Sequence, residues 1–138
     1  MDLQIEVELR DGLLFVTASG TVTLEASVRL LKQVFDTAKE KGVNKILVTT
    51  LAVDGELSTF DRYAMGTQLA EYIQQRHIDV RVAFYGKRPT TDGFAARVAQ
   101  NRGIVTEVFY NYEDAVNWLA KWKAHLLANS AGEANDLV

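Results

Sequence analysis

The second half of the sequence repeats one arrangement three times: an apolar, β-rich run is followed by a segment with helical periodicity. The runs are KILVTT (45–50), VRVAFYG (80–86) and IVTEVFY (104–110). The helical segments follow from residue 59 to about 75, from 93 to about 102 and from 112 to about 127. Strands that alternate with helices pair in parallel and are covered on both faces, so such runs lose their polar alternation. We therefore predict a mainly parallel sheet.

The N-terminal part has a different pattern. Apolar residues alternate with polar ones, as in a half-buried strand: Leu3, Ile5, Val7 and Leu9. Asp11 and Gly12 suit the positive φ values of a type I′ turn, which predicts a hairpin with residues 13–20 as the partner strand. From Leu24 onward the apolar spacing is helical, and Gly42 can end that helix in the left-handed conformation.

These patterns predict an α/β fold: a β-hairpin and a helix, then three β-α repeats, around a mainly parallel central sheet with one antiparallel edge strand. About four helices are expected. The chain has 138 residues, 48% of them hydrophobic. This is enough to bury one sizeable core, and the chain is short for two domains. We expect one domain over residues 1–128 and a flexible tail over 129–138, because NSAGEANDLV is small and polar.

Composition argues against several classes of function. The formal net charge of −3 offers no general attraction for nucleic acid or anionic membranes. The chain has no cysteine, and its two histidines, His77 and His125, lie far apart, so neither a metal site nor a cofactor is expected. The N-terminus lacks a signal-peptide pattern, and no apolar run approaches the ~20 residues that span a bilayer. The expected location is the cytoplasm.

The strand-to-helix loops are the expected place for a functional site, because right-handed crossovers put them at one edge of a parallel sheet. In the first loop, Ser58 precedes a helical stripe and Asp61 follows three residues later, the spacing of a helix N-cap. A serine at an exposed helix N-terminus can also accept a phosphate, since the helix dipole stabilises added negative charge. Both interpretations of Ser58 stay open.

The second loop, GKRPTTD, combines two cations with capping residues. Lys87 and Arg88 follow a strand, and Thr90, Thr91 and Asp92 are available to cap the next helix. An anion could therefore meet two cations and a helix N-terminus together. The alternative is a solvated turn, because the glycine spacing of a phosphate-binding loop is missing.

The last helix carries an apolar stripe that predicts core packing, with a ligand or partner surface as the alternative: Ala115, Trp118, Leu119, Trp122 and Leu126. Asn111 is its expected N-cap.

No catalytic residue is predicted. A Ser-His-acid triad would need His77 or His125, and neither is expected at the loop edge. Asp54 and Glu56 could form a carboxylate pair or bind a divalent ion, but hard cations need more oxygen ligands than this loop offers. We therefore expect a protein that is not an enzyme.

The order of elements resembles the STAS domain, the fold of anti-sigma-factor antagonists and of sulfate-transporter tails. More closely, the chain is similar to SpoIIAA-like bacterial proteins, which sequence classifications link to CRAL-TRIO lipid-transfer domains. The resemblance lies in three stretches that span nearly the whole folded chain: KILVTTLAVDGELSTFDRYAMG, VRVAFYGK and GFAARVAQNRGIVTEVFYNYEDAVNWL. It implies a non-enzymatic role.

In the antagonist pattern, an aspartate precedes the regulatory serine, and a small residue and a glycine follow it. Ser58 falls on the position of the phosphorylated serine, with Thr59 beside it. Leu57 stands in place of the aspartate and Phe60 in place of the glycine.

Two hypotheses for function follow. The apolar bulk of Leu57, Phe60, Tyr63 and Met65 exceeds what capping requires, which indicates a pocket or a contact patch. The first hypothesis is a small binding or regulatory module that holds an apolar or lipid-like ligand, or a protein partner, at the loop-helix edge around residues 54–63. Its candidate residues are Asp54, Leu57, Ser58, Thr59, Phe60, Tyr63, Lys87, Arg88 and Thr91. The alternative is a partner-switching protein regulated by phosphorylation at Ser58.

Self-association is a further expectation. The first strand has an unpaired edge, and apolar residues at the loop edge could also mediate contact, so a homodimer is expected.

Overall fold

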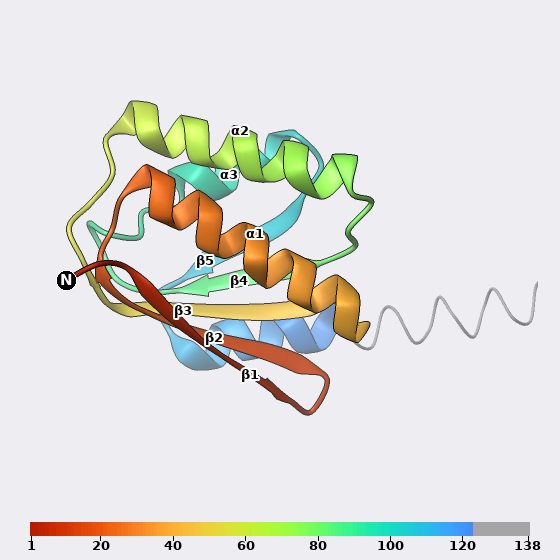
Figure 1. Ribbon diagram of the computed structural model, residues 1–138. Helices are drawn as coiled ribbons and strands as arrows, with labels where there is room; N and C mark the ends of the chain where they lie inside the picture. Colours follow the sequence, from red (N-terminus) through yellow and green to blue (C-terminus); the bar gives the residue numbers. More distant parts are fainter. Residues whose placement is uncertain (123–138) are drawn as a thin grey trace, which may run out of the picture.

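The computed structural model describes residues 1–122 and has one five-stranded sheet with helices on both faces (Figure 1). The elements are β1 (Gln4–Arg10), β2 (Leu13–Thr21), α1 (Leu24–Lys41), β3 (Lys45–Asp54), α2 (Thr59–Gln75), β4 (Arg81–Tyr85), α3 (Phe94–Asn101) and β5 (Val105–Phe109). A last helix begins at residue 112 and is described as far as residue 122. The predicted tail over 129–138 lies outside the described residues.

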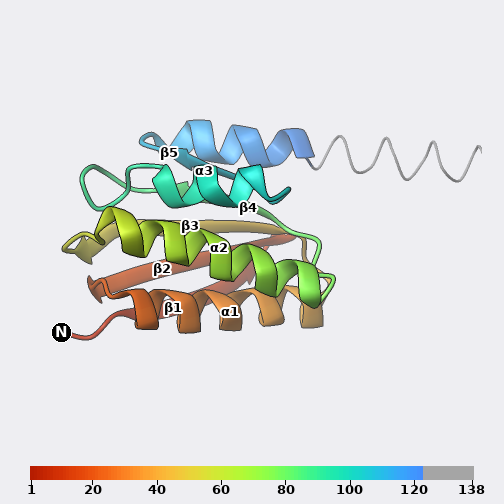
Figure 2. The same cartoon turned by 90° about the horizontal axis from the view of Figure 1, so that it is seen from above.

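The strand order is β1-β2-β3-β4-β5, with β1 antiparallel to β2 and every other pair parallel. Helices α1, α2 and α3 lie side by side on one face, and the last helix covers part of the other (Figures 1 and 2). The predicted fold class is confirmed, including the single antiparallel edge strand.

The hairpin turn and the first helix have the predicted local chemistry. Asp11 and Gly12 both have positive φ, 54° and 74°, and the strands pair directly on either side of them. Thr23 caps α1 by accepting a hydrogen bond from the Ala26 N–H at 3.2 Å. Gly42 ends α1 with φ 68°, in the left-handed region.

The main core lies between the sheet and the helices α1 and α2. Its strand residues include Leu14, Val16, Ile46, Val48 and Val82, and its helix residues include Val34, Phe35, Leu69 and Ile73. A second cluster on the opposite face joins Leu47 and Ala83 to Ala115 and Leu119 of the last helix. Trp118 lies in this second cluster, 5.7 Å from the Phe109 ring. The predicted stripe is therefore core at Ala115 and Leu119, and Leu126 lies outside the described residues.

One prediction for β1 is wrong. Leu3 is buried and Ile5 half-buried against the first turns of α1, but Val7 and Leu9 are 42% and 46% exposed. In Figure 1 the hairpin end lies at the lower edge of the molecule, below the last turns of α1, and Leu3 and Ile5 are the residues of this segment that pack with Ala26 and Leu30 of the helix. The period of two identified the face of the strand correctly, but it could not indicate how far α1 covers that face.

Candidate functional site

The strand-to-helix loops meet at one edge of the sheet, as predicted. They lie together at the left of Figure 1, where β3, β4 and β5 end. Thr90 Oγ1 in the β4–α3 loop donates to the carbonyl of Gly55 in the β3–α2 loop, at 2.6 Å. The Gly86 N–H donates to the carbonyl of Phe109 at 3.1 Å. These bonds fix the loops relative to one another.

Ser58 is the N-cap of α2, which confirms that prediction. Its backbone is extended, and its Oγ accepts a hydrogen bond from the Asp61 N–H at 3.0 Å. Both Ser58 and the next residue, Thr59, are exposed. The hydroxyl therefore serves the helix and is also accessible from outside the molecule.

Phe60 and Tyr63 point outward from the start of α2. Phe60 is 77% exposed and Tyr63 is 50% exposed, and their spacing of three places them on one side of the helix. The inner side of α2 runs through Met65, Leu69 and Ile73, which pack on the core. Phe60 thus contributes to a surface patch, whereas the pocket suggested by this stretch is lined by Leu57 and Met65.

Arg62 is the residue that sequence reasoning did not single out. Its side chain is only 14% exposed and forms an ion pair with Asp92 at 3.0 Å. It also donates to the carbonyl of Pro89 at 2.9 Å and lies 3.5 Å from Glu56. Arg62 therefore connects α2 to both neighbouring loops. The sequence feature that could have indicated this role is an arginine close to the start of a helix. The helix dipole disfavours a cation there unless acidic side chains lie near it.

The β4–α3 loop differs from the predicted anion site. Arg88 is turned toward Tyr110: its Nε donates to the Tyr110 hydroxyl at 3.3 Å, and its guanidinium lies 4.9 Å from the ring centroid. This hydrogen bond raises the pKa of Arg88. Lys87 is exposed.

The predicted capping of α3 is wrong, because its N-cap is Gly93 and no side chain forms the cap hydrogen bond. Asp92 accepts a hydrogen bond from the Phe94 N–H at 3.0 Å, so a carboxylate of the chain itself meets this helix end. Thr90 and Thr91 do not cap α3, because Thr90 bonds the Gly55 carbonyl and Thr91 shares a 2.7 Å hydrogen bond with Thr50.

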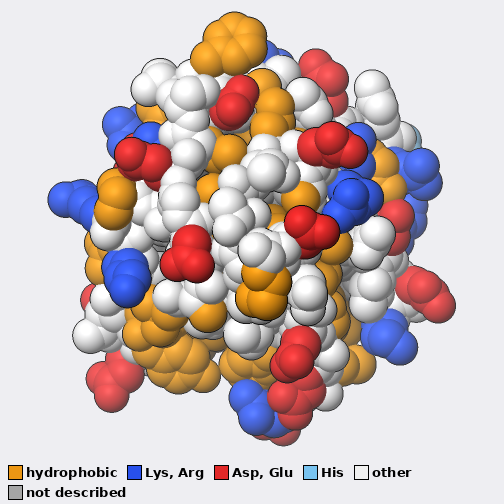
Figure 3. All heavy atoms as spheres, turned by 60° about the vertical axis from the view of Figure 1, so that its left-hand side comes forward, with side chains coloured by type: hydrophobic (Ala, Val, Ile, Leu, Met, Phe, Trp, Pro, Cys, Tyr) orange, Lys and Arg blue, Asp and Glu red, His pale blue; other side chains and the backbone are white. Residues whose placement is uncertain are grey.

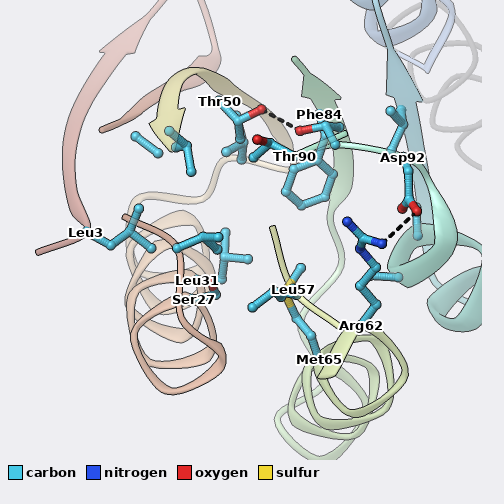
Figure 4. Close-up of a pocket in the computed structure, with 18 of the residues that line it drawn as sticks. Leu3, Ser27, Leu31, Thr50, Leu57, Arg62, Met65, Phe84, Thr90 and Asp92 are labelled. Carbon is cyan, nitrogen blue, oxygen red and sulfur yellow. Dashed lines mark hydrogen bonds and ion pairs between the residues drawn. The ribbon is translucent and has the colours of Figure 1, made fainter. Parts of the chain in front are cut away.

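A cavity of about 120 Å³ lies between the sheet, α1, α2 and the β4–α3 loop. Leu3 and Leu31 line one side, Leu57 and Met65 lie between the two helices, and Phe84 closes the sheet side (Figure 4). Of the predicted site residues, Leu57 and Thr91 line this cavity. Ser58, Thr59, Phe60 and Tyr63 lie on the outer surface with Asp54, the exposed last residue of β3.

The remaining candidates for chemistry are dispersed. His77 follows the end of α2, away from the loop edge, and His125 lies outside the described residues. Within residues 1–122, no group of three or more His, Cys, Asp or Glu side chains is placed to hold a metal ion. In the same range, no helix has the length and apolar character needed to cross a bilayer.

Comparison with known proteins identifies the fold. No protein-family model and no curated protein matches the sequence. Among solved structures, an anti-sigma factor antagonist from Mycobacterium paratuberculosis superposes with a TM-score of 0.59 at 15% identity, over 86% of this chain and 95% of that one. A putative anti-sigma factor antagonist from Thermotoga maritima gives 0.56 at 15% identity, over 84% and 94%.

A third structure, an uncharacterized DUF3478-family protein with a SpoIIAA-like fold from Shewanella loihica, gives 0.50 at 19% identity, over 85% and 93%. The chain therefore has the SpoIIAA-like fold of STAS domains, as its element order predicted. At these identities the likeness concerns the fold.

Proposed function

From this SpoIIAA-like fold, we propose that the protein is a non-enzymatic partner-switching module. A protein partner binds the entry surface of α2, which comprises Ser58, Thr59, Phe60 and Tyr63, and phosphorylation of Ser58 releases it. The observation that carries the proposal is the exposure of Phe60 and Tyr63 beside a capping serine that is itself accessible. Two structural neighbours are anti-sigma factor antagonists, which supports a role in protein binding.

The entry surface has the composition of a contact site. Aromatic side chains are the commonest anchors of protein interfaces, and burying one Phe gains roughly 1.5–3 kcal/mol. Figure 3 views the molecule from the side of the loops, where hydrophobic side chains reach the surface between polar atoms. Asp54, Lys87 and Arg88 are exposed near this edge and supply charges for a polar rim.

Phosphorylation of Ser58 changes this surface more than it changes the fold. A phosphate adds roughly two negative charges, and the free N–H groups at the start of α2 stabilise them. The same charges lie beside Phe60, in a region that already holds Glu56 and Asp61. The entry surface then becomes strongly negative and hydrated, which opposes burial of its aromatic rings in an interface.

The kinase for this site has to recognise Leu57-Ser58-Thr59-Phe60. Leu57 lines the cavity and is only partly accessible, so the accessible part of the motif is the hydroxyl pair with Phe60. A kinase that requires an aspartate before the serine and a glycine at the position of Phe60 is not expected to phosphorylate this chain.

A pair of variants at one position tests the switch without disturbing the cap. Asn and Asp are both good N-caps, so Ser58→Asn and Ser58→Asp differ mainly in charge. The immobilised variants are used to capture proteins from extracts of cells that express the chain, and captured proteins are identified by mass spectrometry. We expect at least one partner to bind the wild type and Ser58→Asn, and to lose binding at least tenfold to Ser58→Asp.

Phe60→Asp tests the surface itself, and Lys32→Asp on α1 is a control outside it. The same partner should be lost on Phe60→Asp and kept on Lys32→Asp. Equal retention by Ser58→Asn and Ser58→Asp would exclude the switch, and equal retention by wild type and Phe60→Asp would exclude the surface.

A further inference from the structure

The cavity under α1 and α2 has apolar walls and a size that suits a small molecule. Its volume is about 120 Å³, and Leu3, Leu31, Leu57, Met65 and Phe84 are among the side chains that surround it. Apolar cavities of roughly 150 Å³ in proteins remain dry and take up benzene or xenon. A cavity of this kind accepts an apolar body with a few heavy atoms.

One polar group in the cavity wall has no protein partner. Ser27 on α1 is 6% exposed, lines the cavity, and its hydroxyl forms no hydrogen bond with any residue from 1 to 122. A serine inside a helix commonly donates to the carbonyl four residues earlier, but here the Thr23 carbonyl accepts only the Ser27 N–H. Because Ser27 lines the cavity, its hydroxyl can pair with a polar atom from outside the chain that enters this space.

The charges at the cavity already neutralise each other. Within residues 1–122, Arg62 and Asp92 are the only charged residues that line it, and they form an ion pair at 3.0 Å (Figure 4). The hydroxyls of Thr50 and Thr91 bond to each other at 2.7 Å. An occupant that carries a charge would therefore find no free counter-ion, and a neutral occupant is favoured.

We propose that this cavity binds a small uncharged molecule with an apolar body and one hydroxyl or carbonyl group that pairs with Ser27. The site is separate from the entry surface of α2, because neither Phe60 nor Tyr63 lines it.

Two probes test the parts of this proposal: xenon for the apolar cavity and cyclopentanol for the hydroxyl contact. Each is titrated into the ¹⁵N-labelled protein, and amide shifts are followed by NMR. Both probes should shift amides around the cavity, such as Leu31, Leu57 and Ala96, and leave those of the hairpin turn unchanged. Ser27→Ala should weaken the binding of cyclopentanol roughly three- to tenfold, as expected for the loss of one neutral hydrogen bond, and leave the binding of xenon unchanged.

Cavity-filling variants complete the test. Ala96→Leu should abolish the shifts from both probes, and Ala120→Leu, the same change at an exposed position of the last helix, should keep them. If Ala96→Leu does not fold, Ala18→Val fills the same cavity from a strand, where a β-branched residue is favoured. Shifts that are spread over the surface, or that persist in the filled variant, would overturn the site. Equal cyclopentanol affinity in wild type and Ser27→Ala would overturn the role of the hydroxyl.

Discussion

The two sides of the first turns of α2 differ sharply, although they share a few consecutive residues. The outer side presents Phe60 and Tyr63 to solvent, whereas the inner side places Arg62 against Asp92 and Met65 against the cavity. The outer side is free to bind without affecting the fold. The inner side holds two loops in place, so substitutions there are expected to affect stability first and binding second.

The largest effect on stability is expected from Gly86→Ala, at the end of β4 beside the loops that the inner side holds in place. A Cβ at Gly86 would lie 2.1 Å from Thr50 Oγ1 and 2.6 Å from Thr91 Oγ1, so both hydroxyls must move and their hydrogen bond is lost. Overpacking and the lost bond together should lower the free energy of unfolding by about 3 kcal/mol. Urea unfolding followed by tryptophan fluorescence measures this.

Thr50→Ala provides the matched control for that prediction. It removes the nearest clashing atom, so Gly86→Ala should cost at least about 1 kcal/mol less in the Thr50→Ala background than in the wild type. If Gly86→Ala lowered the free energy of unfolding equally in both backgrounds, its effect would not be caused by the close approach of the Thr50 hydroxyl.

Arg62→Leu should have the next largest effect. The substitution leaves Asp92 without its ion-pair partner and the Pro89 carbonyl without its donor, in a site where Arg62 is 14% exposed and Asp92 34%. Because Asp92 is partly solvated, the expected loss is about 2 kcal/mol, below the value for a fully buried pair. Arg97→Leu on the exposed side of α3 should change stability by less than about 0.5 kcal/mol. Similar losses in both variants would contradict the bridging role of Arg62.

The contrast between the two sides also marks the limit of what the sequence could predict. The cap at Ser58 and the turn at Asp11 and Gly12 depend on residues within three positions, so local spacing was sufficient. The role of Arg62 depends on a loop that is 27 residues further along the chain at Pro89, and no local pattern encodes that approach.

The order of strands was predictable for a different reason. Strands and helices that alternate along the chain must be joined by crossover connections. Because these crossovers are right-handed, few strand orders are possible for a parallel sheet. The inner and outer sides of α2 could not be assigned in this way, because Phe60, Tyr63 and Met65 are all large hydrophobic residues, and which of them faces the core depends on how the helix is rotated about its axis. The burial of Val7 and Leu9 was predicted wrongly for a related reason, because their exposure depends on where α1 lies on the sheet.

Ser58→Ala should have an intermediate effect, because the residue caps the helix from the outer side. Loss of the bond to the Asp61 N–H is expected to cost about 1 kcal/mol, whereas Ser58→Asn should cost only a few tenths. Thermal unfolding by circular dichroism compares the two. If both variants lost the same stability, the hydroxyl would contribute through something other than capping.

The smallest effect on stability is expected at the residue with the largest expected effect on binding. Phe60 is 77% exposed, so Phe60→Asp removes little buried area, and the new carboxylate lies in the first turn of α2, where the helix dipole favours it. The free energy of unfolding should therefore change by less than about 0.5 kcal/mol, measured by urea unfolding beside Met65→Asp as the inner-side counterpart. Met65 is half-buried on the main core, so the same carboxylate there should cost several times more. A substantial loss in Phe60→Asp would mean that the ring supports the fold, and the entry surface would then no longer be free to serve a partner.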